Sequence, residues 1–295
     1  MSRRLDRTTP ALLLTLLAFV AFGMLRVAAP VSALGVVFDE PVGFGVVAAV
    51  TSLAGAVLLL MRPVELAVSR WLAGPSRLPS DSELERLGPM LERLGGPAGI
   101  DPGKLILRVQ DDGGINASAG AGHLMFVTTG ALHLPDDQLE AILAHELGHH
   151  RGLHPVAALV VWWLSLPGVA LAAIYRFLRR AVGTIGARLG LLGRLLAVPV
   201  LVLLVIWQVT VMWLFYVADL LSKRADRLSE FSADGAAARW GYGGQLAEAL
   251  ESAAGHEDEV TSRIARLTAD HPPVRERVLR LRDARTPARP VTPQA

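Results

Sequence analysis

Two histidines and a glutamate form a His-Glu-x-x-His pattern at residues 145–149 of this chain. Residues 139–144 (Leu-Glu-Ala-Ile-Leu-Ala) precede the pattern and favour a helix. Because residues four apart lie on one helix face, the imidazoles of His145 and His149 can bind one metal ion. Glu146 lies beside the first ligand, where its carboxylate can take a proton from a water held by that metal. These groups are the minimum needed to hydrolyse a peptide bond with zinc.

The residues around the pattern favour a zinc site over a surface helix that carries these side chains by chance. Apolar residues form a stripe that faces away from the polar residues. Pro135 suits an early helical position, and Asp136 and Asp137 favour the positive end of the helix dipole. Gly148 costs helix stability, so we interpret it as leaving space at the metal. A purely structural helix would gain from alanine there.

The composition narrows the class of protein. The chain has 295 residues and no cysteine, which excludes a Cys-rich zinc site and a disulfide framework. Hydrophobic residues make up 52% of the chain and its mean hydropathy is +0.41, values that point to membrane spans. The net charge is only +2, so the pI of about 9.4 is weak evidence for nucleic acid, and we expect no nucleic-acid partner.

Four long apolar runs lie at residues 11–25, 42–61, 156–175 and 195–218. A helix needs about 20 apolar residues to span the hydrocarbon core, and the last three runs meet this length. The first run is shorter and follows Arg3, Arg4 and Arg7, so a signal peptide is an alternative. We expect an uncleaved span, because a second run follows closely and no convincing cleavage site lies between them. The sequence therefore predicts about four transmembrane helices.

The distribution of basic residues predicts the orientation. Arginines precede the first run and follow the second, while Asp39 and Glu40 lie between them. The positive-inside rule then places the N-terminus and the His-Glu-x-x-His helix in the cytoplasm. The loop between the third and fourth runs carries five arginines and no acid. These runs are therefore either two full spans with a basic outer loop or a basic amphipathic hairpin at the membrane surface.

Between the spans, the sequence predicts a compact α+β unit. Ser80 to Glu83 form a capping box that opens a helix ending near Gly95-Gly96. Residues 105–110, 115–119 and 124–128 are expected to be strands, followed by the His-Glu-x-x-His helix. After the fourth run, helices are expected at 228–240, 245–254, 260–267 and 274–282, with a Pro-rich disordered tail at the end.

A hydrolytic zinc site needs a third protein ligand and an open position. Glu230 and Asp234 are the best candidates, since they lie four apart on one helix face. Glu230 can bind the zinc ion, and Asp234 can accept a hydrogen bond from a ligand histidine and fix its tautomer. The alternative is a solvated acidic face on a surface helix.

The order of these elements resembles the membrane zinc metallopeptidase family that includes HtpX and the CAAX prenyl proteases. The matching segments are residues 116–120, 127–132, 145–149, 230–234 and 271–273, which together with the four runs resemble the HtpX-like branch. A CAAX-processing role is less expected, since those enzymes have more spans. The resemblance implies a mostly α integral membrane fold, with a zincin-like metalloprotease domain containing a small sheet.

The resemblance also implies roles for individual residues. One zinc ion per chain would be bound by His145, His149 and Glu230, with Glu146 activating the water and Asp234 supporting a ligand. The strand containing Asn116, Ala117 and Ser118 would align the substrate backbone by strand addition. His271 and Arg277 would stabilise the oxyanion of the tetrahedral intermediate. For His271, a helix N-cap region is the alternative.

The expected organisation is a transmembrane hairpin (1–62), a first catalytic part (63–154), a second hairpin (155–220), a second catalytic part (221–285) and a tail (286–295). We expect a multi-pass protein of a bacterial-type plasma membrane, acting as a zinc endopeptidase of the EC 3.4.24 type. Its partners would be the lipid bilayer and polypeptide substrates, membrane or misfolded proteins cut at the cytoplasmic face for quality control. The alternatives are a signalling protease that cuts one regulator or precursor peptide, and a catalytically silent scaffold.

Overall fold

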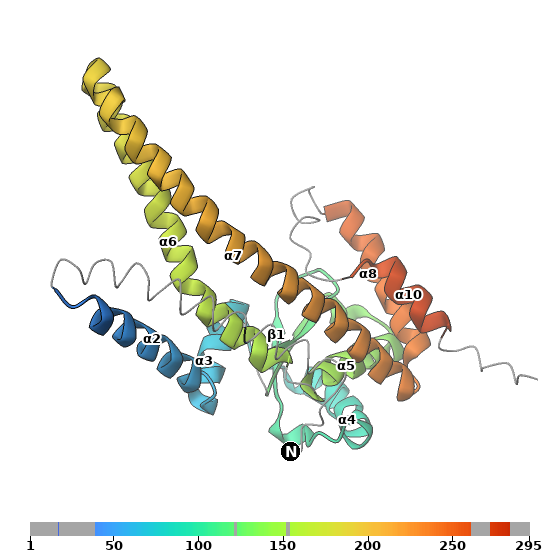
Figure 1. Cartoon of the computed structure of the whole chain (residues 1–295). Helices are drawn as coiled ribbons and strands as arrows, with labels where there is room; N and C mark the ends of the chain where they lie inside the picture. The colour runs from blue at the N-terminus through green and yellow to red at the C-terminus, as the bar shows by residue number, and fades with distance from the viewer. Residues whose placement is uncertain (1–16, 18–38, 121–122, 152–153, 261–271, 284–295) are drawn as a thin grey trace, which may run out of the picture. The chain divides into compact units, whose positions relative to one another are not determined.

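The computed structural model describes residues 17, 39–120, 123–151, 154–260 and 272–283 (Figure 1). The chain divides into two compact units. The first contains the described residues between 62 and 156 and between 223 and 283, and the second contains those between 17 and 61 and between 157 and 222. The fold is mostly helical with one small sheet, as the sequence predicted.

The first unit contains a three-stranded sheet in the order β1-β3-β2. Its strands are β1 (Ile106–Gln110), β2 (Ala117–Gly120) and β3 (Leu124–Thr128). β1 pairs with β3 in parallel and β2 pairs with β3 antiparallel. All five residues of β3 are buried. Within the described sheet β2 pairs only with β3, so it is an edge strand.

The expected strand at 115–119 begins later, at Ala117, because the Thr128 side chain takes over the hydrogen bonds that precede it. The Thr128 hydroxyl accepts from the backbone N–H of Asn116 at 2.9 Å and donates to Gly114 O at 2.6 Å. The extended segment before β2 is therefore fixed to β3 without a regular ladder.

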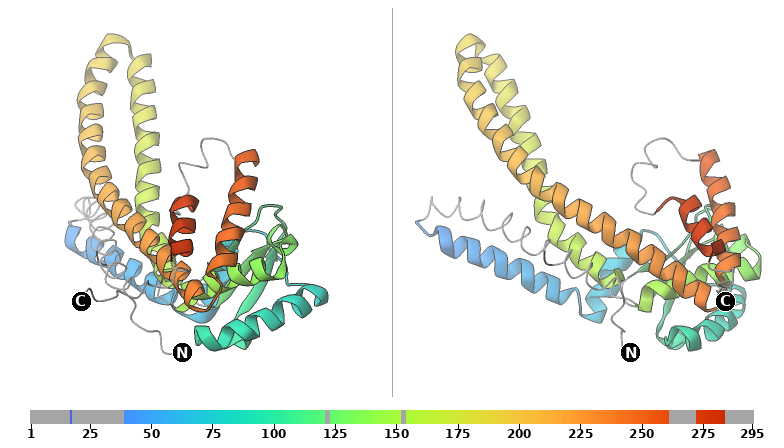
Figure 2. Two further views of the ribbon diagram at one scale, coloured as in Figure 1. Left: turned by 90° about the vertical axis from the view of Figure 1, so that its right-hand side faces the viewer. Right: turned by 45° about the vertical axis from the view of Figure 1, so that its right-hand side comes forward.

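Helices surround this sheet. In chain order they are α3 (Arg62–Ala73), α4 (Asp81–Ala98), α5 (Asp136–Arg151), the start of α6 (His154–Arg188), the last part of α7 (Gly190–Arg239), α8 (Gly243–Val260) and α10 (Val274–Asp283), with 3-10 turns at Pro102–Lys104 and Ala131–His133. Buried apolar residues of α4, α5, α8, α10 and the sheet form one core. Figures 1 and 2 show α5 lying among these elements, so the His-Glu-x-x-His helix is central to the unit.

The capping box predicted for α4 is present, with Ser80 as the N-cap and Glu83 as its partner. The predicted end at Gly95-Gly96 is wrong, because the helix continues to Ala98 and ends at Gly99, whose φ is 65°. A Cβ on Gly95 would lie 2.7 Å from Cγ of Pro102. The glycine at 95 therefore permits close packing and does not end the helix.

Two side chains, Arg93 and Tyr242, connect α5 to its neighbours through three hydrogen bonds to the buried Glu140. Arg93 of α4 donates two hydrogen bonds to the Glu140 carboxylate, at 2.9 and 2.8 Å, and Tyr242 donates a third at 2.8 Å. The hydrogen bonds from Arg93 lower the pKa of Glu140, although burial opposes this shift. Because Tyr242 directly follows the C-terminal turn of α7, this network holds the ends of α5 and α7 together.

The second unit contains α2 (Pro41–Leu58) and the parts of α6 and α7 that form an antiparallel hairpin (Figure 2). Trp163 of α6 donates a hydrogen bond to the carbonyl oxygen of Ser52 in α2 at 2.9 Å. The sequence predicted an apolar run at 195–218 and a separate helix at 228–240. In the structure both segments belong to α7, which is one helix of 50 residues from Gly190 to Arg239.

No single described helix meets the length and hydropathy expected of a membrane span, whereas Gly45–Leu58 and Arg62–Ala73 meet them together as a pair bent by 91°. The four expected spans therefore stay a prediction. The first apolar run lies outside the described residues except for Leu17, and so do His271, most of the expected helix at 260–267 and the tail.

Candidate metal centre and active site

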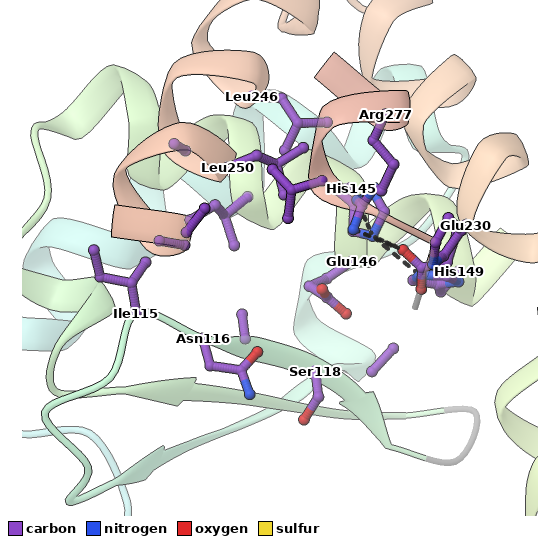
Figure 3. Close-up of a pocket in the computed structure, with 18 of the residues that line it drawn as sticks. Ile115, Asn116, Ser118, His145, Glu146, His149, Glu230, Leu246, Leu250 and Arg277 are labelled. Carbon is purple, nitrogen blue, oxygen red and sulfur yellow. Dashed lines mark hydrogen bonds and ion pairs between the residues drawn. The ribbon is translucent and has the colours of Figure 1, made fainter. Parts of the chain in front are cut away.

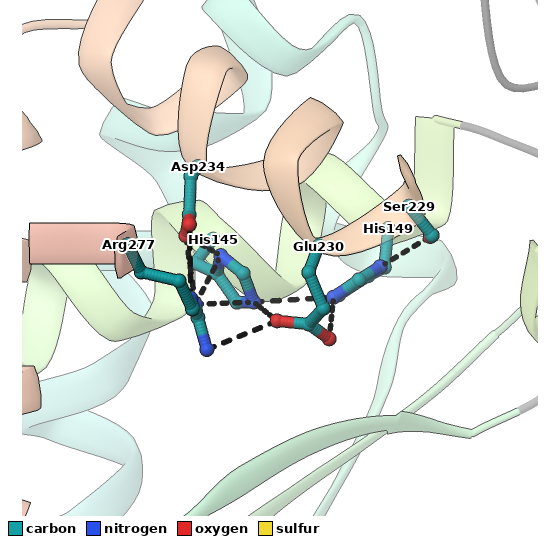
Figure 4. Close-up of polar contacts among 6 residues, drawn as sticks. All are labelled: His145, His149, Ser229, Glu230, Asp234 and Arg277. Atoms are coloured by element: carbon teal, nitrogen blue, oxygen red, sulfur yellow. Dashed lines mark hydrogen bonds and ion pairs between the residues drawn. The ribbon is translucent and has the colours of Figure 1, made fainter. Parts of the chain in front are cut away.

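Two helices supply the three predicted metal ligands. His145 and His149 lie four apart on α5, and their Nε2 atoms are 3.1 Å apart (Figure 4). Glu230 of α7 places Oε1 at 3.3 Å from Nε2 of His149 and Oε2 at 3.5 Å from Nε2 of His145. All three side chains are buried. The structure thus brings together residues that are about 80 positions apart in the sequence.

The donor atoms of these three side chains lie close enough together to hold one metal ion. With zinc–ligand bonds of about 2.0–2.1 Å, neighbouring donor atoms in a tetrahedron lie about 3.3–3.4 Å apart. The two Nε2 atoms are 3.1 Å apart, but the distances of 3.3 and 3.5 Å go to different oxygens of Glu230, Oε1 and Oε2. One donor atom from each of the three side chains lies within 4.8 Å of the others. Two imidazole nitrogens and a carboxylate oxygen are also an established ligand set for zinc.

The charges around the site give a second, independent indication of a divalent cation. Glu146, Glu230 and Asp234 are buried acids, and Arg277 is the buried base beside them. When both ligand imidazoles are neutral, as metal binding requires, three negative charges and one positive charge leave two negative charges in excess. Burying such an excess is costly unless a cation compensates it. A divalent metal would neutralise the site.

The same negative charge affects the protonation of His145. Burial alone would lower the pKa of this imidazole, but hydrogen bonds with Asp234 and Glu230 raise the pKa to about 9. Hydrogen bonds from His145 and Arg277 in turn hold the pKa of Asp234 below its usual range, against the effect of burial. A metal ion would take the place of the proton on Nε2 of His145.

Both ligand histidines are oriented through their other ring nitrogen. Nδ1 of His145 lies 2.9 Å from Oδ1 of Asp234, and Nδ1 of His149 lies 3.2 Å from Oγ of Ser229 (Figure 4). A proton on each Nδ1 leaves the Nε2 lone pair for a metal. The sequence indicated Asp234 but not Ser229. The only signal for Ser229 was its position next to Glu230.

Gly148 permits the close approach of the two helices. A Cβ at this position would lie 2.9 Å from Cα of Ala233 and 3.1 Å from its carbonyl oxygen. Ala233 lies between Glu230 and Asp234 on α7. Our interpretation that Gly148 leaves space for the metal is therefore wrong, because the space is occupied by the backbone of α7.

Arg277 of α10 binds both acids of α7. Its Nε and Nη2 donate to Asp234 at 2.9 and 2.7 Å, and its Nη1 lies 3.0 Å from Oε2 of Glu230. These contacts raise the pKa of Arg277, although burial opposes the shift. The structure thus gives Arg277 a positioning role. Its predicted part in oxyanion stabilisation stays a prediction, and its expected companion His271 lies outside the described residues.

The metal-ligand group opens into a pocket of about 450 Å³ (Figure 3). Glu146 lies in this pocket beside the ligands, as its proposed role requires. Asn116, Ala117 and Ser118 of the edge-strand region line one wall. The opposite wall is apolar and comes mainly from α8, which the sequence did not associate with the site: Leu246, Ala249, Leu250, Ala253 and Ala254.

A His-Glu-x-x-His helix, a glutamate ligand from a later helix and an edge strand beside the pocket are together typical of zincin-like metallopeptidases. The chain belongs to peptidase family M48, whose family model matches residues 83–285. This range includes every ligand and supporting residue described above. A comparison with curated proteins found no match. The protein is therefore a metal-dependent peptidase, with His145, His149 and Glu230 as a group able to hold the metal ion.

Proposed function

We propose that this chain is a zinc-dependent endopeptidase of the cell membrane, which cuts membrane or misfolded proteins at the cytoplasmic face in an HtpX-like quality-control role. The observation that carries the proposal is the arrangement of His145, His149 and Glu230 in one pocket with Glu146. Nitrogen and carboxylate ligands without sulfur suit zinc in a hydrolytic site. When bound there, zinc supplies a water of lowered pKa and polarises the scissile carbonyl.

Glu146 is the proposed proton carrier of the reaction. Its carboxylate accepts the proton of the attacking water and delivers it to the nitrogen of the leaving amine, as a general base and then a general acid. Its burial in the pocket excludes competing water and strengthens these electrostatic interactions. Arg277 keeps Asp234 and Glu230 in place during this step through its buried hydrogen bonds and ion pair.

The proposed substrate is an extended polypeptide. β2 has one side without a strand partner in the described sheet, and that strand region borders the pocket. A peptide that pairs with this edge is held by main-chain hydrogen bonds, which accept many sequences. Its side chains would meet the apolar wall of α8. Selection would therefore depend on apolar character and extended conformation, as expected for clients of quality control.

Two features support the proposed membrane location. Residues 42–61, 156–175 and 195–218 are long apolar runs. In the second unit many large apolar side chains are exposed, including Val46, Leu58 and Val209. Such surface is unfavourable in water and suits a lipid environment.

The proposal is tested by comparing the membrane proteomes of cells that express the wild-type chain or the Glu146→Gln variant. Substrates should accumulate in the variant, and the topology of the accumulated proteins should place the cut segments in the cytoplasm. A single accumulating regulator would favour the signalling alternative over quality control. Identical proteomes in both strains would contradict a proteolytic role for this site.

A further inference from the structure

The hairpin formed by α6 and α7 carries a charge pattern that the peptidase chemistry does not use. From residue 154 to residue 218 the sequence contains no acidic residue and five arginines: Arg176, Arg179, Arg180, Arg188 and Arg194. All five are exposed and lie in the distal part of the hairpin, near its turn at Leu189 and Gly190 (Figures 1 and 2). The distal hairpin, residues 176–196, is therefore uniformly basic.

Close packing of the two helices directs these arginines outward. A Cβ on Gly186 of α6 would lie 2.7 Å from Cβ of Ala197 and 3.2 Å from the carbonyl oxygen of Gly193. Gly186, Gly193 and Ala197 are buried, while the residues that flank them are exposed. The helices thus meet through small residues, and the long side chains cover the outer surface of the distal hairpin.

Apolar side chains are exposed in the same segment. On α6, Arg176, Arg179 and Arg180 occupy one arc of the helix, whereas Phe177 and Ile185 lie on another. Phe177 is 69% exposed, and the exposed apolar residues of the turn and of α7 continue this surface: Leu189, Leu191, Leu192, Leu195 and Leu196. The distal hairpin therefore presents guanidinium groups and bulky apolar groups side by side.

We infer that the distal hairpin binds the headgroups of anionic phospholipids. Guanidinium groups bind phosphate through two parallel hydrogen bonds, and leucine and phenylalanine insert at the boundary between headgroups and acyl chains. The segment has no acidic residue over 65 positions. Therefore no carboxylate within it competes with the lipid phosphates for the arginine side chains. A soluble acidic partner would satisfy the arginines but would leave the exposed leucines in water.

This inference goes beyond the proposed peptidase activity, because it specifies the lipid class that the hairpin recognises. It shares only the membrane location with the proposed function. Lipid contact can be measured on the Glu146→Gln variant, without any cleavage. A failure of the lipid inference would therefore leave the proposed activity intact, and the reverse also holds.

The experiment uses the full chain reconstituted into vesicles. Because the sequence has no cysteine, Leu192→Cys gives one unique site for a fluorescent probe in the distal hairpin. Quenching is measured with brominated phosphatidylglycerol and, separately, with brominated phosphatidylcholine at equal mole fraction. The probe should be quenched preferentially by phosphatidylglycerol, and this preference should weaken as salt screens the charges. Equal quenching by the two lipids, or no quenching by either, would overturn the inference.

The arginines are tested with a matched pair of triple variants. Replacing Arg176, Arg179 and Arg180 with glutamine should lower the preference for phosphatidylglycerol at least about fivefold, which is the expected effect of one basic residue at an anionic surface. The triple lysine variant keeps the charge and should retain most of the preference. A probe on Ser82→Cys, at an exposed position of α4, should show no lipid preference. An unchanged preference in the glutamine variant would contradict the assignment.

Discussion

Gly148 of α5 and Ala233 of α7 bring the backbones of two helices into direct contact at the metal-ligand group. The space that a Cβ on Gly148 would need contains Cα of Ala233 at 2.9 Å. On α5, His149 directly follows Gly148. On α7, Glu230 precedes Ala233 by three residues and Asp234 directly follows it. The geometry of the site therefore depends on a residue that has no functional group of its own.

The Gly148→Ala variant should separate α5 from α7. Although alanine favours a helix over glycine, the overlap with Ala233 should cost about 1–3 kcal/mol and move Glu230 away from the histidines. We expect weaker zinc binding and a lower melting temperature, measured by chelator competition and thermal unfolding. Gly88→Ala is the matched control, because a Cβ on Gly88 meets no atom within 4 Å in the middle of α4. Equal zinc affinity in both variants would contradict the role of the contact.

Ser229 should contribute to metal binding although it is not a ligand. Its Oγ lies 3.2 Å from Nδ1 of His149 and fixes the orientation of that ring. Loss of such a partner typically lowers metal affinity about 10- to 100-fold. We expect a decrease of about tenfold for Ser229→Ala in a zinc titration, with little change in the fold by circular dichroism. Ser252→Ala, which removes a hydrogen bond on α8, should bind zinc like the wild type. If both variants bind zinc equally, the Ser229 contact has no such role.

The capping box of α4 should make part of the stability depend on pH. Hydrogen bonds from Arg77 lower the pKa of Glu83 from 4.5 to about 2. Because the folded-state pKa is depressed, this contribution is present above about pH 4.5 and is lost as the pH falls toward about 2. The difference in melting temperature between the wild type and Glu83→Gln should therefore be largest at neutral pH and shrink at pH 3. A difference that stays constant with pH would contradict the shift.

The apolar wall of α8 should select the side chains of the substrate. Leu250 lines the pocket opposite the edge-strand region (Figure 3). Leu250→Trp should fill part of this space and reduce kcat/KM for peptides with large apolar side chains more than tenfold relative to peptides with small ones. Glu248→Trp places the same bulk on the exposed face of α8 and should leave the ratio unchanged. Peptide-library cleavage measures both, and an unchanged ratio in the Leu250 variant would exclude α8 from substrate selection.

Local signals in the sequence predicted much of the fold. The capping box at Ser80 and the strand Leu124–Thr128 were correct, because side-chain hydrogen bonding and buried β-branched or aromatic residues act over short distances. The end of α4 was wrong, since Gly95 serves a contact with Pro102 that is not local. The continuity of α7 was also missed, because an apolar run and a polar helix can be one element when no breaker separates them.

The ligand set was also predictable, because its members lie in two short segments of the sequence. His145, His149 and Glu146 share one short motif, and Glu230 and Asp234 share one helix turn. The roles of Ser229 and of the α8 wall could not be predicted, because a serine and an alanine-rich helix acquire such roles only from the residues that pack beside them. The role of Gly148 likewise depends on Ala233, which is 85 positions away in the sequence.

The central claim is that Glu146 moves the proton at a zinc site formed by His145, His149 and Glu230. The most direct measurement compares zinc content and peptide hydrolysis in purified wild-type, Glu146→Gln and His149→Ala proteins. We predict that the wild type holds one zinc ion and cleaves, that Glu146→Gln holds one zinc ion and loses cleavage by several orders of magnitude, and that His149→Ala loses both. Full cleavage by the Glu146→Gln variant, or unchanged zinc content in His149→Ala, would contradict the account.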